Sequence, residues 1–423
     1  MLSTLRNAWK VPELRKRFLW TIFLVAIFRI GIHIPVPGID TSALSTLTES
    51  GGLLSFYNLI SGGAFTKASI LALSVSPYIN ASIIMQLLTI AIPSLEQLSK
   101  EGEEGRKKIQ SITRYVSIGI ACVLALGVYS TIANLGATSG VGTPEKIVII
   151  FSLVVGSTFC MWLGDQITQK GFGNGVSILI FVNIVSQIPS TVNSVYTLKT
   201  AGEISIIEIL LFLVGVIALL AVTIFFSLAE RRVPIQYAGK AVGSKVMKGQ
   251  STHIPLSIIG SAVIAIIFAM SVMMFPTTIA AFFPSKGWAS WITSSKYSIF
   301  NTGTWMYPVC YAVLTVFFTW FYTQITFKPD EMAENLHKSA GFVPGIRPGE
   351  ATEKYFEKLL TKVSIIGGLF AAFLAVTPIL VGKYISGVQF GGTSLLILIG
   401  VALDFSRQLD SQLVMRHYDG FLK

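Results

Sequence analysis

Side chains that could carry out bond chemistry are few in this chain, and they are scattered. Cys122, Cys160 and Cys310 lie in three different apolar stretches without the CxxC spacing of a zinc site, so we expect buried, small apolar side chains. The four histidines form no HExxH pair, and no GxSxG motif occurs. The sequence therefore predicts no enzyme, no metal site and no cofactor.

The densest glycine segment, KGFGNGVS at residues 170–177, is not a phosphate-binding loop. It lacks the GxxxxGK[ST] order with which backbone N–H groups and a lysine surround phosphates. We interpret it as a tight turn that leads into an apolar helix. Any ATP hydrolysis that drives this protein must then come from a partner.

Small polar side chains inside one apolar stretch indicate a different chemistry. Between residues 74 and 86, Ser, Tyr, Asn and Gln alternate with Val and Ile, and we expect Pro77 to interrupt this helix. We expect such a helix to line a water-filled cavity, or an interface between helices that can open, because its polar side chains would be unsatisfied against lipid on all sides. Arg29, Glu208 and Asp404 lie near the ends of their stretches, where their charges can reach water. Without carboxylates near the bilayer centre, an ion-coupled transporter is disfavoured.

Ten apolar stretches must position these residues. Of the 423 residues, 52% are hydrophobic and 13% charged, and the mean hydropathy is +0.68, whereas soluble domains carry about 25% charge. Most stretches approach the ~20 residues that cross the hydrocarbon layer. We therefore expect an all-α polytopic membrane protein with ten transmembrane helices. They fall at residues 18–34, 68–92, 115–135, 147–164, 176–192, 204–229, 254–283, 305–327, 363–381 and 388–403.

Lysine and arginine alternate between the two sides of these stretches. The N-terminus and the segments after the second, fourth, sixth, eighth and tenth stretches hold 25 of the 32 basic residues, and the five other segments hold 6. Because basic residues beside spanning helices stay in the cytoplasm, both termini are predicted to be cytoplasmic. The loops at 230–253 and 328–362 face the same side and are longer than helix connections require, which favours docking of a large partner.

The segment FYNLISGGAF at residues 56–65 is short, moderately apolar and broken by two glycines on the predicted outer side. One interpretation is a plain external loop with a glycine turn. The other is a short helix that folds back into the protein interior, where protein rather than lipid surrounds it.

The run SGGAFTKASILALSVSPYINASIIMQLLTI at 61–90 resembles the plug and second helix of the SecY family, whose members are the central channel subunit of the bacterial protein translocase. The likeness extends over essentially the whole chain. It includes FRIGIHIPVPGID at 28–40, KEGEEGRKKIQSITRY at 100–115, DQITQKGFGNGVSILIF at 165–181, AERRVPIQYA at 229–238, GFVPGIRPGEAT at 341–352 and GGTSLLI at 391–397.

The resemblance implies two inverted-topology halves, residues 1–195 with helices one to five and residues 196–423 with helices six to ten. Unfolded polypeptides would pass between the halves, through a ring of aliphatic side chains that dewets and blocks ions when empty. By family position, the ring consists of Val75, Ile79, Val176, Ile180, Ile267 and Ile397.

The resemblance also implies a plug and a lateral gate. The plug, residues about 56–67, would seal the outer funnel, and a glycine pair would give it backbone freedom. Its implied residues are Phe56, Leu59, Ile60, Gly62, Gly63 and Phe65. Helices two and seven would open laterally to release signal sequences and membrane segments into lipid. The implied gate residues are Ser82, Gln86, Ile259 and Ile264.

The seventh helix departs from the family pattern. Where bacterial relatives usually carry Lys, Asn, Gly and Pro, this chain has Ser257, Ile259, Ala262 and Ala265. One hypothesis is a gate with a more apolar seam and a straighter helix, because the proline break is lost. The other is neutral drift, compensated in helix two.

In the family, the long loops after helices six and eight bind the ribosome or the SecA motor ATPase. The planar guanidinium group can bind both rRNA phosphates and protein carboxylates. Most of the lysines are explained equally well as solvated charges of an exposed loop without a partner. The implied contacts are Arg231, Arg232, Lys240, Lys245 and Lys248 in the first loop and Arg347, within GIRPGE, in the second.

The family further implies SecE and SecG subunits, signal peptides and nascent chains as partners. It also implies that the protein is located in the phospholipid bilayer of the bacterial cytoplasmic membrane. Two alternatives stay open. An accessory SecY-type translocase with a narrow substrate set would fit the unusual seventh helix. A secondary transporter shares the helix count and the inverted repeats, but it needs a midplane substrate site with ion ligands.

Overall fold

The computed structural model describes residues 9, 11–39, 58, 61–134, 142–200, 202, 205–237, 241–242, 245–246, 251–260, 262–283, 286–301, 303–384 and 392–419. Each of the ten apolar stretches contains one long helix in this part of the chain. These are α2 (Pro12–Gly31), α5 (Ser76–Ala91), α7 (Glu103–Asn134), α8 (Thr143–Lys170), α9 (Gly175–Thr200), α10 (Ile206–Leu228), α11 (Ala262–Phe282), α13 (Met306–Phe327), α15 (Glu350–Tyr384) and α16 (Gly392–Asp419).

Among the described residues, seven helices are long and apolar enough to cross a membrane: α7, α8, α9, α10, α11, α13 and α15. An eighth span results if α5 and α6 (Pro93–Lys100), which are bent by 101°, form one broken span. The structure thus confirms the predicted fold class, an all-α polytopic membrane protein. The number of ten spans and the division at residue 195 remain predictions.

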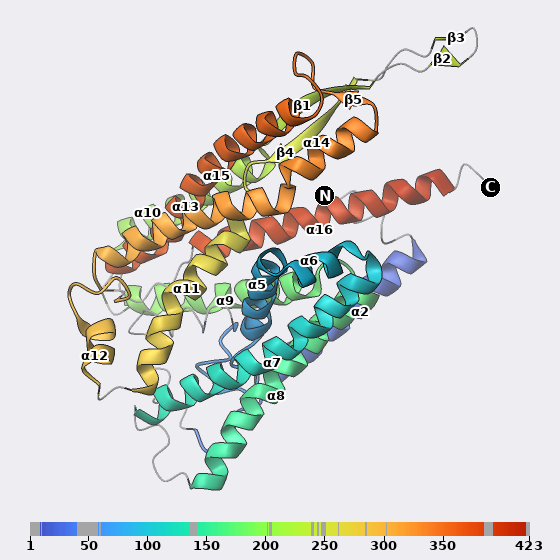
Figure 1. Cartoon of the computed structure of the whole chain (residues 1–423). Helices are drawn as coiled ribbons and strands as arrows, with labels where there is room; N and C mark the ends of the chain where they lie inside the picture. Colours follow the sequence, from blue (N-terminus) through green and yellow to red (C-terminus); the bar gives the residue numbers. More distant parts are fainter. Residues whose placement is uncertain are drawn as a thin grey trace.

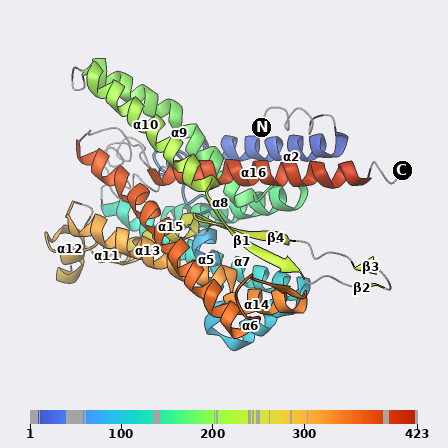
Figure 2. The same cartoon turned by 90° about the horizontal axis from the view of Figure 1, so that it is seen from above.

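The helices gather in two groups (Figure 1). In this view α2, α5, α7 and α8 lie in the lower part of the molecule and α10, α13 and α15 in the upper part, while α11 runs between them and contacts both α5 and α7. Seen from above, α2 and α16 lie side by side (Figure 2), and the rings of Phe18 and Phe405 are 6.5 Å apart. The two ends of the chain therefore meet at one face.

The two long loops that were predicted to face the cytoplasm contribute to one folded unit, which the sequence did not suggest. Strands β1 (Glu230–Tyr237), β4 (Ser251–Ser257) and β5 (Gly341–Phe342) form an antiparallel sheet in the order β4-β1-β5, with Val233 opposite Ile254 and Gln236 opposite Phe342. Strands β2 (Ala241–Val242) and β3 (Lys245–Val246) form a separate hairpin. We call the unit of β1, β4, β5 and α14 (Pro329–Lys338) the loop module.

The loop module has its own apolar core. Val233 and Ile235 alternate with exposed residues along β1, as expected of a strand with one covered face. They pack with Leu256 of β4 and with residues from the α13–α15 connection and the start of α15. The prediction of a loop at 328–362 is therefore wrong in part, because α14, β5 and the first turns of α15 lie within it. Both loops contribute strands to the same sheet, and this explains why they are longer than helix connections need to be.

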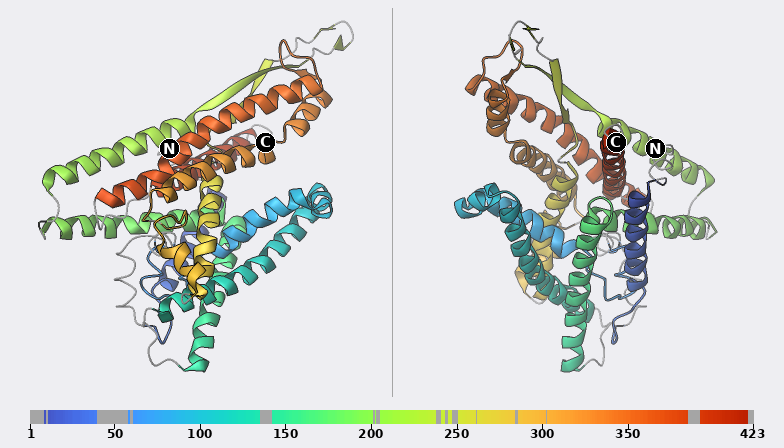
Figure 3. Two further views of the ribbon diagram at one scale, coloured as in Figure 1. Left: turned by 60° about the vertical axis from the view of Figure 1, so that its left-hand side comes forward. Right: turned by 90° about the vertical axis from the view of Figure 1, so that its right-hand side faces the viewer.

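The short helix α12 (Gly287–Ser294) connects α11 to α13. It lies at the lower left of Figure 1 while the loop module lies at the upper right, and the two are again well apart in both views of Figure 3. Among the described residues, the three larger clusters of buried side chains in the helical part each join several elements, and a smaller one lies between α2 and α16. Of the three larger clusters, one joins α2, α8, α9 and α16, one joins α7 and α8 to the segment before α5, and one joins α11, α13 and α15.

Candidate functional site

The six aliphatic side chains predicted for the ring meet in one apolar cluster. Val75, Ile180 and Ile397 are buried, with 0%, 6% and 6% of their surfaces exposed, and the other three pack against this cluster while partly exposed. Residues from α5, α9, α11 and α16, four segments far apart in the sequence, therefore contact one another here. An apolar constriction built in this way excludes water and ions.

The segment before α5 sets the position of Val75. We expected helix from Ala68 onward with an interruption at Pro77, and this is wrong: residues 61–75 run through consecutive turns and α5 begins at Ser76. Pro77 lies in the first turn of α5, where its missing N–H removes no hydrogen bond inside the helix. The turns are mostly buried and pack against α9 in the same cluster, so they hold Val75 inside it.

The segment predicted as plug is described at Asn58 and at residues 61–67, so Phe56, Leu59 and Ile60 lie outside the described residues. Asn58 Oδ1 accepts hydrogen bonds from the backbone N–H and the hydroxyl of Thr66, both at 3.1 Å. Its carbonyl accepts from Gly63 N at 2.9 Å and from Gln187 Nε2 at 3.2 Å. Phe65 is 2% exposed. This part of the segment is therefore a compact turn inside the protein rather than a plain external loop.

Side chains of α2 and α9 form the surface on which this turn lies, and we call Arg29, Asn183, Ser186 and Gln187 the plug seat. Gly62 has a φ of +66°, and a Cβ added there would lie 2.5 Å from Asn183 Oδ1 and 3.0 Å from Arg29 Nη1. Asn183 Nδ2 donates to Ser74 Oγ at 3.3 Å, and Arg29 Nη1 donates to Ser186 Oγ at 2.9 Å. Arg29, which was expected to reach water near the end of its stretch, thus also has a partner inside the protein.

The structure does not bring the four predicted gate residues together. Ser82 and Gln86 line a cavity of about 210 Å³ between α5 and α7, next to Arg106 and Gln110. Ile264 lies in α11, half-buried. Ile259 is 6% exposed, precedes α11 and packs with side chains of α11, α13 and α15.

The seventh apolar stretch is not helical throughout. Ser257 is the last residue of β4, Ile259 follows the strand, and α11 begins at Ala262. Ser257 and Ile259 therefore do not belong to the helix whose surface was predicted to form the gate. Pro276 does lie inside α11, but the hypothesis of a straighter helix concerned the position of Ala265 and stays a hypothesis.

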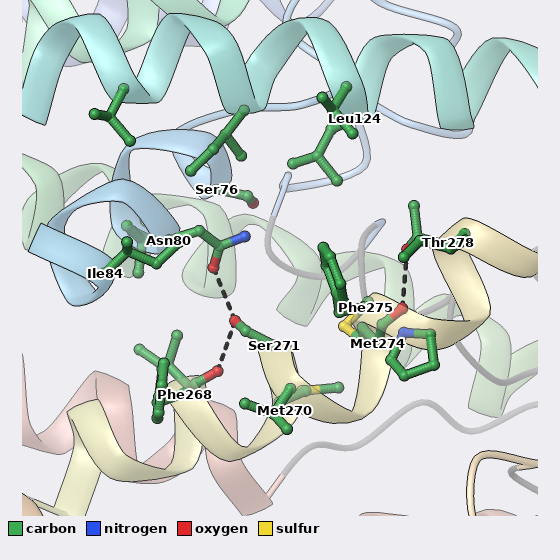
Figure 4. Close-up of a pocket in the computed structure, with 18 of the residues that line it drawn as sticks. Ser76, Asn80, Ile84, Leu124, Phe268, Met270, Ser271, Met274, Phe275 and Thr278 are labelled. Atoms are coloured by element: carbon green, nitrogen blue, oxygen red, sulfur yellow. Dashed lines mark hydrogen bonds between the residues drawn. The ribbon is translucent and has the colours of Figure 1, made fainter. Parts of the chain in front are cut away.

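A larger apolar cavity lies where α5, α7 and α11 meet (Figure 4). Its volume is about 780 Å³, and its walls are almost entirely apolar. The Ser271 hydroxyl lies 2.8 Å from Asn80 Oδ1 and 2.9 Å from the carbonyl oxygen of Ile267, and it donates its proton to one or the other. Methionines and aromatic side chains of α11 surround this contact, among them Phe268, Met270, Met274 and Phe275.

The Asn80–Ser271 contact was missed by the reasoning from sequence. Asn80 was recognised as one of the small polar residues of its helix, but its partner was not. The available signal was Ser271 itself, since it is the one hydroxyl-bearing residue in the otherwise apolar run from Ala262 to Phe275.

Three of the six predicted partner contacts lie on the loop module or in the loop that follows β5. Arg231 and Arg232 are exposed on β1, and Arg347 is exposed in the loop after β5, between Gly345 at φ +82° and Gly349 at φ +99°. The carbonyl oxygen of Arg347 accepts a hydrogen bond from Thr352 Oγ1 at 2.9 Å, which orders this loop. Lys245 belongs to β3, and Lys240 and Lys248 lie outside the described residues.

The remaining candidates for chemistry stay apart. Within the described part of the chain, no three His, Cys, Asp or Glu side chains gather around a point that could hold a metal ion. Cys160 is buried and Cys310 is half-buried, but Cys122 is exposed on α7, so the expectation of burial is wrong for Cys122. The glycine segment at 170–177 is the turn between α8 and α9, as predicted, with Gly173 at φ +79°.

Comparison with known proteins agrees with this geometry. The sequence model of the SecY family matches residues 69–406. The chain is 40% identical over 420 residues to a protein translocase subunit SecY of Rickettsia typhi, covering 97% of this chain and 96% of that protein.

Two solved structures share the fold. A protein-conducting channel superposes with a TM-score of 0.67, and the Sec61 channel of a canine ribosome–channel complex with a TM-score of 0.62. Both are 17% identical to this chain, and each alignment covers 96% of both chains. The family match and the identity over nearly the whole length establish that the chain belongs to the SecY family of protein translocase subunits.

Proposed function

We infer that this chain is the channel subunit of a protein translocase, which moves unfolded polypeptides across a membrane and releases transmembrane segments sideways into it. The observation that carries this inference is the apolar cluster in which six aliphatic side chains from α5, α9, α11 and α16 meet. Its members offer neither charge nor a hydrogen bond to a passing chain, so no polypeptide sequence is held there selectively. When no polypeptide occupies it, the same ring keeps out ions because it dewets.

Residues 61–67 act as part of the plug that seals this ring. The hydrogen bonds of Asn58 keep the turn compact, and the plug seat on α2 and α9 receives Gly62 so closely that a larger residue does not fit. The left-handed φ of Gly62 and Gly63 costs glycine little. The closed state is therefore favoured by several small polar contacts, which an incoming chain can displace one after another.

The cavity between α5, α7 and α11 is the lateral gate. Its apolar walls receive a hydrophobic signal sequence, which gains about 25 cal/mol for each Å² of apolar surface that leaves water. The Asn80–Ser271 contact joins α5 to α11 across the cavity. We assign the gate to this contact in place of Ser82, Gln86 and Ile259.

The loop module binds the partners that drive transport, either the SecA ATPase or the ribosome. Arg231, Arg232 and Arg347 provide exposed guanidinium groups on one folded unit. The canine Sec61 channel of the same fold was solved in a complex with a ribosome, which supports this assignment. SecE and SecG complete the assembly. The excess of basic residues places both termini and the loop module in the cytoplasm and the channel in the bacterial cytoplasmic membrane.

Site-specific crosslinking tests the channel. After Cys122, Cys160 and Cys310 are replaced, single cysteines are introduced at Ile79 and Ile180, and a secretory precursor is stalled partway through. Crosslinks from the middle of the precursor to both positions are expected. A cysteine at Phe151, which is 68% exposed on α8 and faces outward, is the matched control and should not react. If export proceeds without crosslinks at the two ring positions, the conduit lies elsewhere.

A further inference from the structure

The connection between α11 and α13 exposes a group of aromatic side chains. Trp288 is 45%, Trp291 55% and Tyr297 77% exposed, although aromatic side chains of this size are usually well covered. Trp288 and Trp291 are three residues apart in α12, so they lie on the same face of that helix. Ala289 is the buried residue of α12 and packs on the opposite side. The aromatic face is thus turned away from the protein.

The segment that follows holds this face in a fixed position. Ser298 is buried, and its hydroxyl donates to the carbonyl oxygen of Ile292, in α12, at 2.7 Å. Thr304 Oγ1 lies 3.0 Å from the carbonyl oxygen of Ser298, and Asn301 Nδ2 donates to the carbonyl oxygen of Ser295 at 3.2 Å. Since these bonds fold the connection back on itself, the tryptophans extend from an ordered platform and not from a plain loop.

Charge around the aromatic face has one sign. Between Phe283 and Trp305 the sequence contains no Asp or Glu, while Lys286 and Lys296 are both exposed. Indole and phenol rings prefer the boundary between hydrocarbon and headgroups, because an apolar ring and a polar N–H or O–H are satisfied together there. Ammonium groups beside them complement lipid phosphates. The chemistry of this surface matches a phospholipid headgroup layer.

The position of α12 next to a helix that can span the membrane also supports phospholipid as the partner. Four residues separate the end of α11 from the start of α12, and α11 is one of the helices that can span the bilayer. The ring of Trp288 lies 5.9 Å from that of Phe283, at the end of α11. The loop module lies at the end of α13 and α15 that points away from α12 (Figure 1), so α12 belongs to the outer side if the loop module is cytoplasmic.

We propose that α12 is an interfacial anchor whose aromatic face lies in the phospholipid headgroup layer of the outer leaflet, where it fixes the depth of α11. The sidedness rests on the proposed function. The anchor bears on the gate because α11 forms one wall of the large cavity, and because Phe300, from the same connection, also lines it. Movement of α11 along the membrane normal is thereby restrained, while rotation and lateral movement, which open the cavity, are left free.

Depth-dependent fluorescence quenching tests the anchor. The full chain, within its translocase complex, keeps Trp288 and Trp291 while the other five tryptophans become phenylalanine. It is reconstituted in phosphatidylethanolamine and phosphatidylglycerol vesicles that contain lipids brominated near the headgroup or near the chain end. We expect the shallow label to quench these tryptophans more strongly than the deep label does, because interfacial indole rings lie at the level of the headgroups.

The matched control carries Phe317→Trp as its one tryptophan. Phe317 lies halfway along α13 and is 49% exposed, so the deep label should quench it better. If Trp288 and Trp291 are quenched by aqueous iodide and by neither lipid, the surface faces water or another protein and the proposal is overturned. Stronger quenching by the deep label would overturn it too.

Disulfide formation between cysteines at Asn80 and Ser271 tests the link to the gate. The pair Trp288→Ala and Trp291→Ala is expected to change its rate several-fold, whereas Trp288→Phe and Trp291→Phe, which keep an aromatic ring, should change it little. If the disulfide forms at the same rate in both double variants, the aromatic rings of α12 do not influence the position of α11. Neither readout needs polypeptide transport, so a chain that fails to translocate would refute the proposed function and leave this result standing.

Discussion

Replacing Gly62 by alanine should weaken the contact between the plug and its seat. The φ of Gly62 is +66°, and an L-residue in this region costs about 1–2 kcal/mol. The new Cβ would lie 2.5 Å from Asn183 Oδ1, so this fully buried amide must move. Its hydrogen bond to Ser74 is then strained or lost, which adds about 1 kcal/mol. The displaced plug escapes both costs, because it is free to choose another φ.

The docked state is therefore destabilised by about 2–3 kcal/mol, and the ratio of displaced to docked plug rises about 30- to 140-fold at 1.4 kcal/mol for each factor of ten. The measurement is ion flux through purified channels in proteoliposomes without a substrate polypeptide. A leak that rises with the displaced fraction is expected. The same variant should export a precursor with a weakened signal sequence better than the wild type does.

Two glycines of this chain serve as matched controls. Gly63→Ala meets the same backbone cost at φ +86°, but its Cβ would lie 3.3 Å from Nε2 of Gln187, the far end of a side chain that can move. We expect it to leak less than Gly62→Ala. Gly202→Ala, at φ +77° with nothing within 4 Å and far from the plug in sequence, should not leak. The reasoning is refuted if Gly62→Ala leaks no more than Gly202→Ala, or less than Gly63→Ala.

Ser271→Ala removes the hydrogen bond between α11 and Asn80, so the closed gate should lose about 0.5–1.5 kcal/mol and accept less hydrophobic signal sequences. Thr89→Ala, which breaks a bond within α5 only, is the control in the same export assay, and equal effects would contradict the assignment. Ile259→Asn buries an amide in the α11–α13–α15 cluster, so thermal unfolding should show a loss of about 2 kcal/mol or more; an unchanged melting temperature would contradict this. Arg347→Ala should lower SecA-driven transport without lowering the melting temperature, because the side chain is exposed, and Arg347→Lys should restore it only in part.

Much of the fold follows from the sequence because its causes are local. A long apolar run must be helical in a bilayer, since no water satisfies its backbone there, and each predicted stretch does contain a helix. Loop charge is equally local, so sidedness can be predicted residue by residue. The ring positions came from motifs of the family, and Val75, Ile79 and Ile397 indeed lie in one cluster.

Helix boundaries were less predictable, because hydrophobicity does not distinguish a buried turn or strand from a helix. Residues 68–75 are as apolar as α5 but form turns, and Ser69 among them pairs with Pro35 in an isolated antiparallel bridge. Ile254 and Leu256 belong to a strand because β1 pairs with them. Both outcomes depend on contacts with distant parts of the chain.

Sequence by itself thus determined which segments enter the membrane, which side their loops face and which residues can form an apolar ring. Only the tertiary structure decided which side of each helix faces which neighbour. Asn80 and Gln86 lie on the same helix, yet Asn80 contacts α11 and Gln86 lines a cavity against α7. A helix whose polar residues surround it has no preferred face of its own. Its rotation is fixed by packing against α7 and α11, and that packing is absent from any local pattern of residues.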